Sequence, residues 1–180
     1  MKGVILFGSP RKDGNTMQLV RAFAEALEGC GHDMRMVYLN DIEIRPCQGC
    51  LACLPEGDCP IDDDMAEVKQ YVLESDLMVY ATPIYWYGPS GQMKLFMDRS
   101  IAFEDGGFNS RIRGKKAVTL MTCGDETPGA FTQTREMLEK TFNLLGLTWA
   151  GNVEATGCHD KGPVKQKFLE EAKNLARSLP

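Results

Sequence analysis

Short segments of continuously apolar residues alternate with segments of helical periodicity along this chain of 180 residues. Val4–Phe7 and Leu77–Ala81 are continuously apolar, Ala117–Met121 is apolar apart from Thr119, and none of the three alternates polar with apolar residues. Such strands are typical of a parallel sheet, because both faces of each strand are then covered by helices. The sequence therefore predicts an α/β fold with a doubly wound parallel sheet.

Five strands and five helices are expected in alternation. The expected strands are Val4–Phe7, Met34–Leu39, Leu77–Ala81 ending at Pro83, Ala117–Met121 and Leu147–Ala155. The expected helices follow the loop Gly8–Thr16, the acidic run Asp62–Asp64 and the pair Pro89 and Ser90, and the last two cover Thr132–Leu145 and Pro163–Leu179. Because this length suits one domain, we expect a single domain over 1–180 with a cysteine-rich insertion at about 45–62.

The net charge and the cysteine content indicate which partners and which cellular compartment to expect. The net charge is -5 and no basic block offsets it, which argues against nucleic acid and anionic membranes as partners. The apolar run after Met1-Lys2-Gly3 is too short for a signal-peptide core or a membrane span. An odd number of cysteines, seven, is typical of a reducing compartment. We expect a cytoplasmic protein.

The loop Gly8–Thr16 directly follows the first strand, where open α/β sheets bind their ligands. Ser9, Asn15 and Thr16 offer side-chain donors, and the helix that follows presents free N–H groups and a partial positive charge. Arg11 can add a charge-assisted contact. These features predict a phosphate site.

The loop does not match two nucleotide-binding patterns. A Walker loop requires Gly-Lys-Ser/Thr, whereas this loop has Gly14-Asn15-Thr16. A dinucleotide loop requires three glycines at G-x-G-x-x-G spacing, which this loop does not have. With these two patterns excluded, the loop is expected to bind a monophosphate through hydroxyls and amides, as in FMN sites. The alternative is a loop that only caps a helix.

Three consecutive aromatic residues, Tyr85-Trp86-Tyr87, follow the third strand. Adjacent side chains of an extended segment point to opposite faces, so at least one of the three is expected at a surface or groove. A flat isoalloxazine ring needs apolar walls of this kind. The alternative is an aromatic corner that stabilises the turn or a subunit contact. Opposite a phosphate loop, the flavin interpretation is favoured, and Cys123-Gly124 after the fourth strand is expected to line the same crevice.

Four cysteines occupy the run Cys47-x2-Cys50-x2-Cys53-x5-Cys59. Thiolates are metal ligands, and four of them complete a tetrahedral shell. In the bacterial ferredoxin run the fourth cysteine serves a second cluster. No second run exists here, so Cys59 would have to close the same cluster. Zinc and a metal-free thiol loop are the alternatives.

The loop Gly8–Thr16, the segment Thr82–Arg99 and the cysteine run followed by Asp63-Asp64-Met65 together resemble the NADPH-dependent FMN reductase family, specifically its iron–sulfur flavoprotein branch. The resemblance implies a flavodoxin-like fold with strand order 2-1-3-4-5, noncovalent FMN and a homodimer or homotetramer. It also implies one [4Fe–4S] cluster on Cys47, Cys50, Cys53 and Cys59. The implied cofactor-binding residues are Ser9, Arg11, Asn15, Thr16 and Met17 in the first loop, Pro83, Ile84, Tyr85 and Trp86 along the ring, and Cys123 and Gly124 on its far side.

These residues predict an FMN-dependent oxidoreductase in which NAD(P)H reduces the flavin and electrons pass between FMN and a [4Fe–4S] cluster. No separate nicotinamide motif is visible, so a ferredoxin is an equal candidate for the donor, and the acceptor is a small molecule or a protein. A cluster-free NAD(P)H:FMN or quinone reductase is one alternative, and a noncatalytic flavodoxin-like electron carrier is another. No catalytic acid or base is required, and we expect surface or structural roles for His32 and His159.

Overall fold

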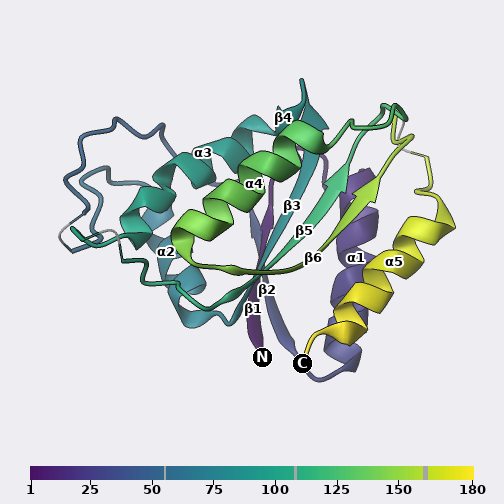
Figure 1. Cartoon of the computed structure of the whole chain (residues 1–180), viewed down its shortest axis with the longest axis horizontal. Helices are drawn as coiled ribbons and strands as arrows, with labels where there is room; N and C mark the ends of the chain where they lie inside the picture. The colour runs from purple at the N-terminus through teal and green to yellow at the C-terminus, as the bar shows by residue number, and fades with distance from the viewer. Residues whose placement is uncertain (55, 108, 160–161) are drawn as a thin grey trace.

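The computed structural model describes residues 1–54, 56–107, 109–159 and 162–180, and its centre is a parallel sheet (Figure 1). The sheet has the order β2-β1-β3-β5-β6, and every neighbouring pair along this path is parallel. The strands are β1 (Lys2–Phe7), β2 (Asp33–Tyr38), β3 (Leu77–Tyr85), β5 (Lys116–Thr122) and β6 (Thr148–Ala155). A sixth, two-residue strand, β4 (Gly88–Pro89), pairs with β3 alone and in the antiparallel sense. The flavodoxin-like fold class is confirmed, with six strands in place of five.

Helices cover both faces of this sheet (Figure 1). The helices are α1 (Asn15–Gly29) and α5 (Gln166–Ser178) on one face, and α2 (Met65–Glu74), α3 (Gly91–Arg99) and α4 (Thr132–Leu145) on the other, with a short 3-10 helix, η1 (Ser100–Phe103), after α3. Each face has its own core, because successive side chains of a strand point to opposite sides. Val4 and Leu6 of β1 belong to the core beneath α2, α3 and α4, whereas Ile5 and Phe7 belong to the core beneath α1 and α5.

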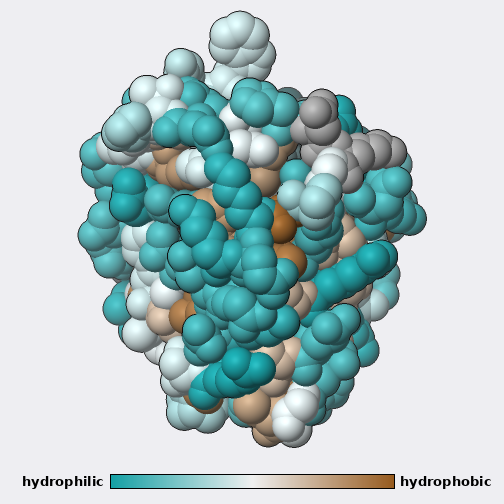
Figure 2. Space-filling model, turned by 90° about the vertical axis from the view of Figure 1, so that its right-hand side faces the viewer, coloured by the Kyte–Doolittle hydropathy of each residue, from teal (hydrophilic) through white to brown (hydrophobic). Residues whose placement is uncertain are grey.

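The face of the molecule that carries α5 is largely polar (Figure 2). Seen from the side that carries α5, the molecule is mostly hydrophilic, with small hydrophobic areas between the polar side chains (Figure 2). None of the described helices combines the length and the apolar character that crossing a bilayer requires.

Strand β3 continues through Pro83 to Tyr85, beyond the expected end of the third strand. Pro83 is aligned with Thr122 in the last pair of the β3–β5 ladder. A proline is tolerated there because its missing N–H removes no bond from the middle of the sheet. Past this point β3 turns back as a hairpin, in which Tyr85 is paired with Gly88. This hairpin carries the aromatic run outward from the sheet.

Two fully buried threonines in neighbouring strands differ in their hydrogen bonds. Thr82 of β3 accepts a hydrogen bond from the N–H of Ser90 at 3.0 Å and donates to the carbonyl of Pro83 at 2.9 Å. Thr119 of β5 has no hydrogen-bond partner for its hydroxyl among the described residues. A buried polar group without a partner costs free energy, whereas a paired one does not.

Replacing each threonine by the isosteric valine is therefore expected to change stability in different ways. Thr119→Val should leave the free energy of unfolding unchanged or raise it by up to about 1 kcal/mol, because an unpaired hydroxyl is removed. Thr82→Val should lower it by about 1–3 kcal/mol, because the buried N–H of Ser90 loses its acceptor. Urea denaturation measures both values. Equal destabilisation by the two substitutions would contradict this account.

Candidate functional site

A small pocket lies where the carboxyl ends of β1, β3 and β5 meet the amino end of α1. Its volume is about 70 Å³, well below the roughly 300 Å³ at which pockets for drug-sized ligands begin. We call it the first-loop pocket, and its lining is Ser9, Arg11, Gly14, Asn15, Thr16, Pro83, Ile84, Tyr85, Thr122, Gly124 and Cys158. Most of the predicted cofactor-binding residues therefore come together from three separate segments of the chain. A pocket of this size suits one end of a ligand.

The amino end of α1 faces this pocket, and its N-cap residue, Gly14, has no side chain that could cap it. Among the described residues, the first N–H groups of the helix are therefore left for a ligand. The hydroxyl of Ser9 accepts a hydrogen bond from the N–H of Arg11 at 3.1 Å, which fixes the loop. The guanidinium of Arg11 is exposed, and no described residue pairs with it. The pocket thus combines free N–H donors with a free cation, which suits an anion.

Thr16 and Met17, two neighbouring residues of α1 predicted to bind the cofactor, point into different surroundings. The hydroxyl of Thr16 lies 2.7 Å from that of Thr122, which ties α1 to the end of β5 at the floor of the pocket. The side chain of Met17 is 3% exposed and packs in the core beneath α1 and α5. Thr16 therefore lines the pocket and the side chain of Met17 does not.

A wider hollow of about 210 Å³ adjoins this pocket on the side of the β3–β4 hairpin. Its lining residues are Ile84, Trp86, Tyr87, Cys123 and Asp125, and Ile84 also lines the first-loop pocket. Trp86 is 96% exposed, as expected for one member of the aromatic run. Trp86 and Tyr87 form the hairpin turn with φ of 50° and 64°, values that two-residue hairpin turns require. The two spaces together form a crevice with a polar end and an aromatic wall.

Two residues that the sequence reasoning did not assign to the site also lie at this crevice. Cys158 lines the first-loop pocket, and burial raises the pKa of its thiol, although a hydrogen bond with Asn15 opposes the rise. The imidazole of His159 lies against Gly124, where an added Cβ would come within 2.7 Å of its Nδ1. Both residues follow β6, and the rule that ligands collect at carboxyl ends of strands could have indicated them. Gly124 is needed for the approach of His159.

The four cysteines of the run line a separate hollow beside α3 and η1. Cys47, Cys50, Cys53 and Cys59 surround a space of about 150 Å³, which we call the cysteine hollow. Burial raises the pKa of Cys53, and the negative forms of the other three thiols raise it further. In Figure 1 this loop projects at the left, away from the carboxyl ends of β3, β5 and β6.

The arrangement of these thiols bears on what they can hold. Among the described residues, no three Cys, His, Asp or Glu side chains converge closely enough to hold a metal ion. A single zinc ion needs sulfur ligands at about 2.3 Å. Four thiols around an open space fit a cluster of several atoms better than they fit one ion, because the donors of a cluster lie further apart. Four cysteines are the donor set that a [4Fe–4S] centre requires.

A buried ion pair joins the two ends of the cysteine loop, the segment between β2 and α2 that carries the four cysteines. The guanidinium of Arg99 donates from Nη1 to Asp63 Oδ2 at 2.6 Å and from Nη2 to Asp63 Oδ1 at 3.1 Å. Asp63 also accepts from the N–H of Arg45 at 2.9 Å, so it joins the two ends of the loop. Burial opposes ionisation of Asp63, but the bonds from Arg99 and from backbone N–H groups prevail and lower its pKa. The carboxylate is therefore used in holding the loop.

The segment between Cys53 and Cys59 depends on a glycine, Gly57, for its conformation. The N–H of Gly57 donates to the carbonyl of Cys53 at 2.6 Å, and its own carbonyl accepts from Lys69 Nζ at 2.7 Å. Gly57 has φ of 83°, and an added Cβ would lie 2.9 Å from the carbonyl oxygen of Ala102. Only glycine fits this position without displacing its neighbours. The loop is thus supported by protein contacts on both sides of Cys59.

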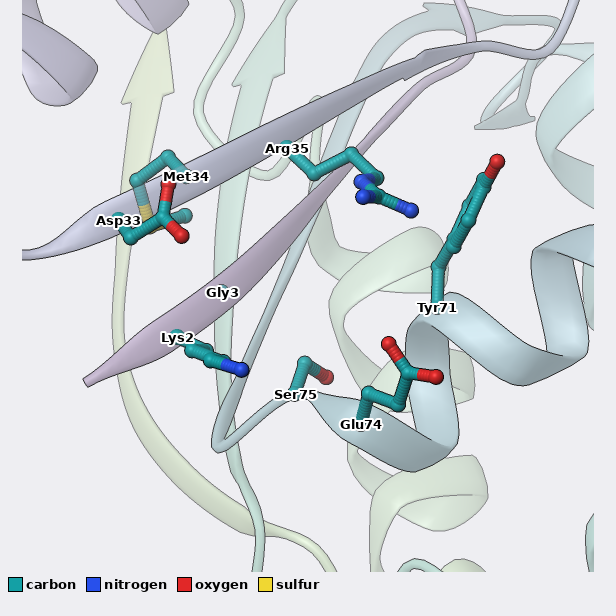
Figure 3. A pocket seen from close by; sticks show the side chains of 8 residues that line it. All are labelled: Lys2, Gly3, Asp33, Met34, Arg35, Tyr71, Glu74 and Ser75. Carbon is teal, nitrogen blue, oxygen red and sulfur yellow. The ribbon is translucent and has the colours of Figure 1, made fainter.

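One further hollow, of about 230 Å³, lies at the opposite end of the sheet, beside the amino ends of β1 and β2 (Figure 3). The guanidinium of Arg35 lies over the ring of Tyr71, 4.0 Å from its centroid. Lys2 and Glu74 line the same hollow. It contains none of the predicted site residues, and it does not lie at the carboxyl ends where open α/β sheets bind ligands.

Comparison with known proteins places the chain in a family. The model of the NADPH-dependent FMN reductase family matches residues 1–156. An iron–sulfur flavoprotein of Archaeoglobus fulgidus is 38% identical over 99% of this chain and 79% of its own length. An iron–sulfur flavoprotein of Methanocaldococcus jannaschii is 32% identical over 99% of this chain and 95% of its own length.

A solved structure supports the fold. The NAD(P)H:quinone oxidoreductase from Methanothermobacter marburgensis superimposes with a TM-score of 0.83 at 22% identity, over 100% of this chain and 99% of that one. The family match, the two relatives and the arrangement of the crevice agree with the resemblance found in the sequence. This chain belongs to the NADPH-dependent FMN reductase family, and its relatives include iron–sulfur flavoproteins.

Proposed function

We propose that this protein is an FMN-dependent NAD(P)H oxidoreductase whose cysteine hollow holds a [4Fe–4S] cluster, with electrons passing between FMN and the cluster. The observation that carries the flavin part is the first-loop pocket, where the amino end of α1 and the guanidinium of Arg11, which no described residue pairs, meet beside an aromatic wall. Membership of the FMN reductase family supports the same conclusion.

The first-loop pocket would hold the phosphate of FMN. Its anionic oxygens would accept hydrogen bonds from the free N–H groups of α1 and from the side chains of Asn15 and Thr16, with Ser9 shaping the loop. Arg11 would add a charge-assisted bond. Each of these donors is placed before the ligand arrives, so little ordering is required on binding.

The wider hollow would receive the isoalloxazine ring. Pro83, Ile84 and Tyr85 would lie along it, with Trp86 at the rim and Cys123 and Gly124 on the far side. Bound FMN accepts a hydride and can release its electrons one at a time, which is chemistry that no side chain of this protein supplies. The chain contributes the apolar wall, with the exposed side chains of Trp86 and Tyr87 at its rim.

The cysteine hollow would hold the cluster through Cys47, Cys50, Cys53 and Cys59. An iron–sulfur centre supplies one-electron transfer at a potential that its surroundings set. The apolar lining from Leu51, Ile61 and Ile101 would limit the access of water. The names of the two relatives support this assignment.

The partners follow from this chemistry. NAD(P)H or a ferredoxin would reduce the protein, and a small molecule or another protein would accept the electrons. We propose a homodimer or homotetramer, since the exposed Trp86 and Tyr87 offer an apolar surface for a second subunit. All seven cysteines lie among the described residues and are free thiols, which suits a cytoplasmic location.

Steady-state oxidation of NADH and NADPH tests the proposed activity. The FMN-loaded protein is expected to oxidise at least one of them when a quinone, free flavin or ferricyanide is present as acceptor. The absence of turnover with both donors and all three acceptors would contradict a reductase. It would favour the noncatalytic electron carrier instead. Turnover by a protein that contains no iron would instead favour the cluster-free reductase.

Arg11→Ala tests the phosphate assignment. A charge-assisted hydrogen bond contributes about 1.5–3 kcal/mol, so the substitution should weaken FMN binding by roughly 10- to 100-fold. Riboflavin lacks the phosphate, and its affinity should not change. Fluorescence titration of flavin-free protein measures both ligands.

Lys12→Ala is the matched control for this measurement. Lys12 is also cationic and belongs to the same loop, but it pairs with Asp41 and does not line the pocket. Its removal should leave FMN affinity within about twofold. An equal loss of FMN and riboflavin affinity in Arg11→Ala would show that Arg11 does not serve the phosphate.

Serine substitutions test the cluster ligands. Cys53→Ser and Cys59→Ser should each lower the iron and acid-labile sulfide of anaerobically purified protein, together with the broad absorbance near 400 nm that a cluster gives. Cys30→Ser is the control, because Cys30 is an exposed thiol outside the cysteine hollow. Iron content that is the same in all four proteins would contradict the assignment.

A further inference from the structure

One guanidinium forms part of the wall between two adjacent hollows. Besides the cysteine hollow, a second space of about 250 Å³ extends toward α2, and the two spaces share Cys59, Ile61, Arg99 and Ala102. The side chain of Arg99 is 1% exposed, so its charge lies inside the protein. A buried cation beside four thiols is an unusual arrangement, because charges are rarely buried unless they are paired.

The hydrogen bonds of Arg99 leave part of this guanidinium unused. Both N–H groups of Nη1 are taken, one by Asp63 Oδ2 at 2.6 Å and one by the carbonyl of Arg45 at 2.9 Å. One N–H of Nη2 bonds Asp63 Oδ1 at 3.1 Å. The Nε–H is buried and has no hydrogen-bond partner among the described residues. A buried donor of this kind costs free energy until an acceptor is present.

The acceptor that lies near the guanidinium is sulfur. Cys59 lines both hollows together with Arg99, and the negative form of its thiol acts on the guanidinium through its charge. Asp63 binds the opposite, forked end of the guanidinium and holds it in place. The cation is therefore fixed between a carboxylate that orients it and a thiol that lines the cysteine hollow.

We propose that Arg99 is a positioning residue for the cysteine hollow, which donates a hydrogen bond to sulfur there and raises the reduction potential of the bound [4Fe–4S] cluster. This inference rests on the cluster of the proposed function. Gain of one electron makes a cluster more negative, and a nearby cation and N–H···S bonds stabilise the reduced form more than the oxidised form. Asp63 opposes this effect only in part, because the guanidinium separates its carboxylate from the thiols.

Two variants test the proposal. The double variant Arg99→Gln with Asp63→Asn removes both charges together, so that no unpaired charge is left buried. Arg99→Lys keeps the charge and the pairing with Asp63, but an ammonium cannot reach Asp63, Arg45 and the sulfur at once. The midpoint potential is measured by titration with dithionite, which supplies one electron to each cluster, and is followed by electron paramagnetic resonance. Iron and sulfide content and bound FMN are measured on the same samples.

The potential of the double variant is expected to be more negative than that of the wild type, and that of Arg99→Lys to lie between them. Lys115→Met is the control: this lysine donates to the carbonyls of Leu73 and Ser75 and lines neither hollow. Its removal should reduce stability without moving the potential.

The outcomes separate this inference from the proposed function. Wild-type protein that binds FMN but holds no iron after anaerobic reconstitution would refute the cluster itself. Wild-type protein with a full cluster, and variants with the same iron content and an unchanged potential, would refute only the role of Arg99. If the double variant cannot hold iron, Arg99→Lys decides: a more negative potential supports the proposal and an unchanged one overturns it.

Discussion

The amino end of α1, set against the carboxyl ends of β1, β3 and β5, is the constraint on which the rest of the site depends. Parallel strands bring their carboxyl ends to one edge of the sheet, so the loops after them meet there whatever their separation in sequence. Gly14 leaves the helix end uncapped, and Thr16 fastens it to Thr122 of β5. The first N–H groups of α1 and the guanidinium of Arg11, none of them paired by a described side chain, therefore face the same small pocket, and the aromatic hairpin lies beside it.

The cysteine loop is supported by a different set of contacts. It begins after β2 and ends at α2, and the buried ion pair of Asp63 and Arg99 holds its two ends together. Gly57 and Lys69 hold the part between Cys53 and Cys59. Because these contacts involve α2, α3 and η1, the cysteines are positioned by the same scaffold that covers one face of the sheet. The first-loop pocket and the cysteine hollow are thus two separate hollows on a single fold.

Local patterns predicted most of the fold and part of the site. The helix over Thr132–Leu145 was predicted with its observed ends, since Gly146 adopts the left-handed conformation that ends a helix. The extension of β3 through Pro83 was not, because a proline is tolerated only if no neighbour needs its N–H, and that depends on register. The spacing of the cysteines indicated that they belong together. It gave no sign of Arg99, which is brought to Cys59 by tertiary packing alone.

The same distinction applies at the crevice. The loop Gly8–Thr16 could be recognised because its donors are close in sequence. The contact of His159 with Gly124 joins distant segments and could not be recognised in this way. The central claim, that the first-loop pocket binds the phosphate of FMN, is tested most directly by titrating flavin-free protein with FMN and with riboflavin. The account predicts one FMN per chain, bound at least tenfold more tightly than riboflavin. Equal affinities, or protein that binds neither ligand, would contradict it.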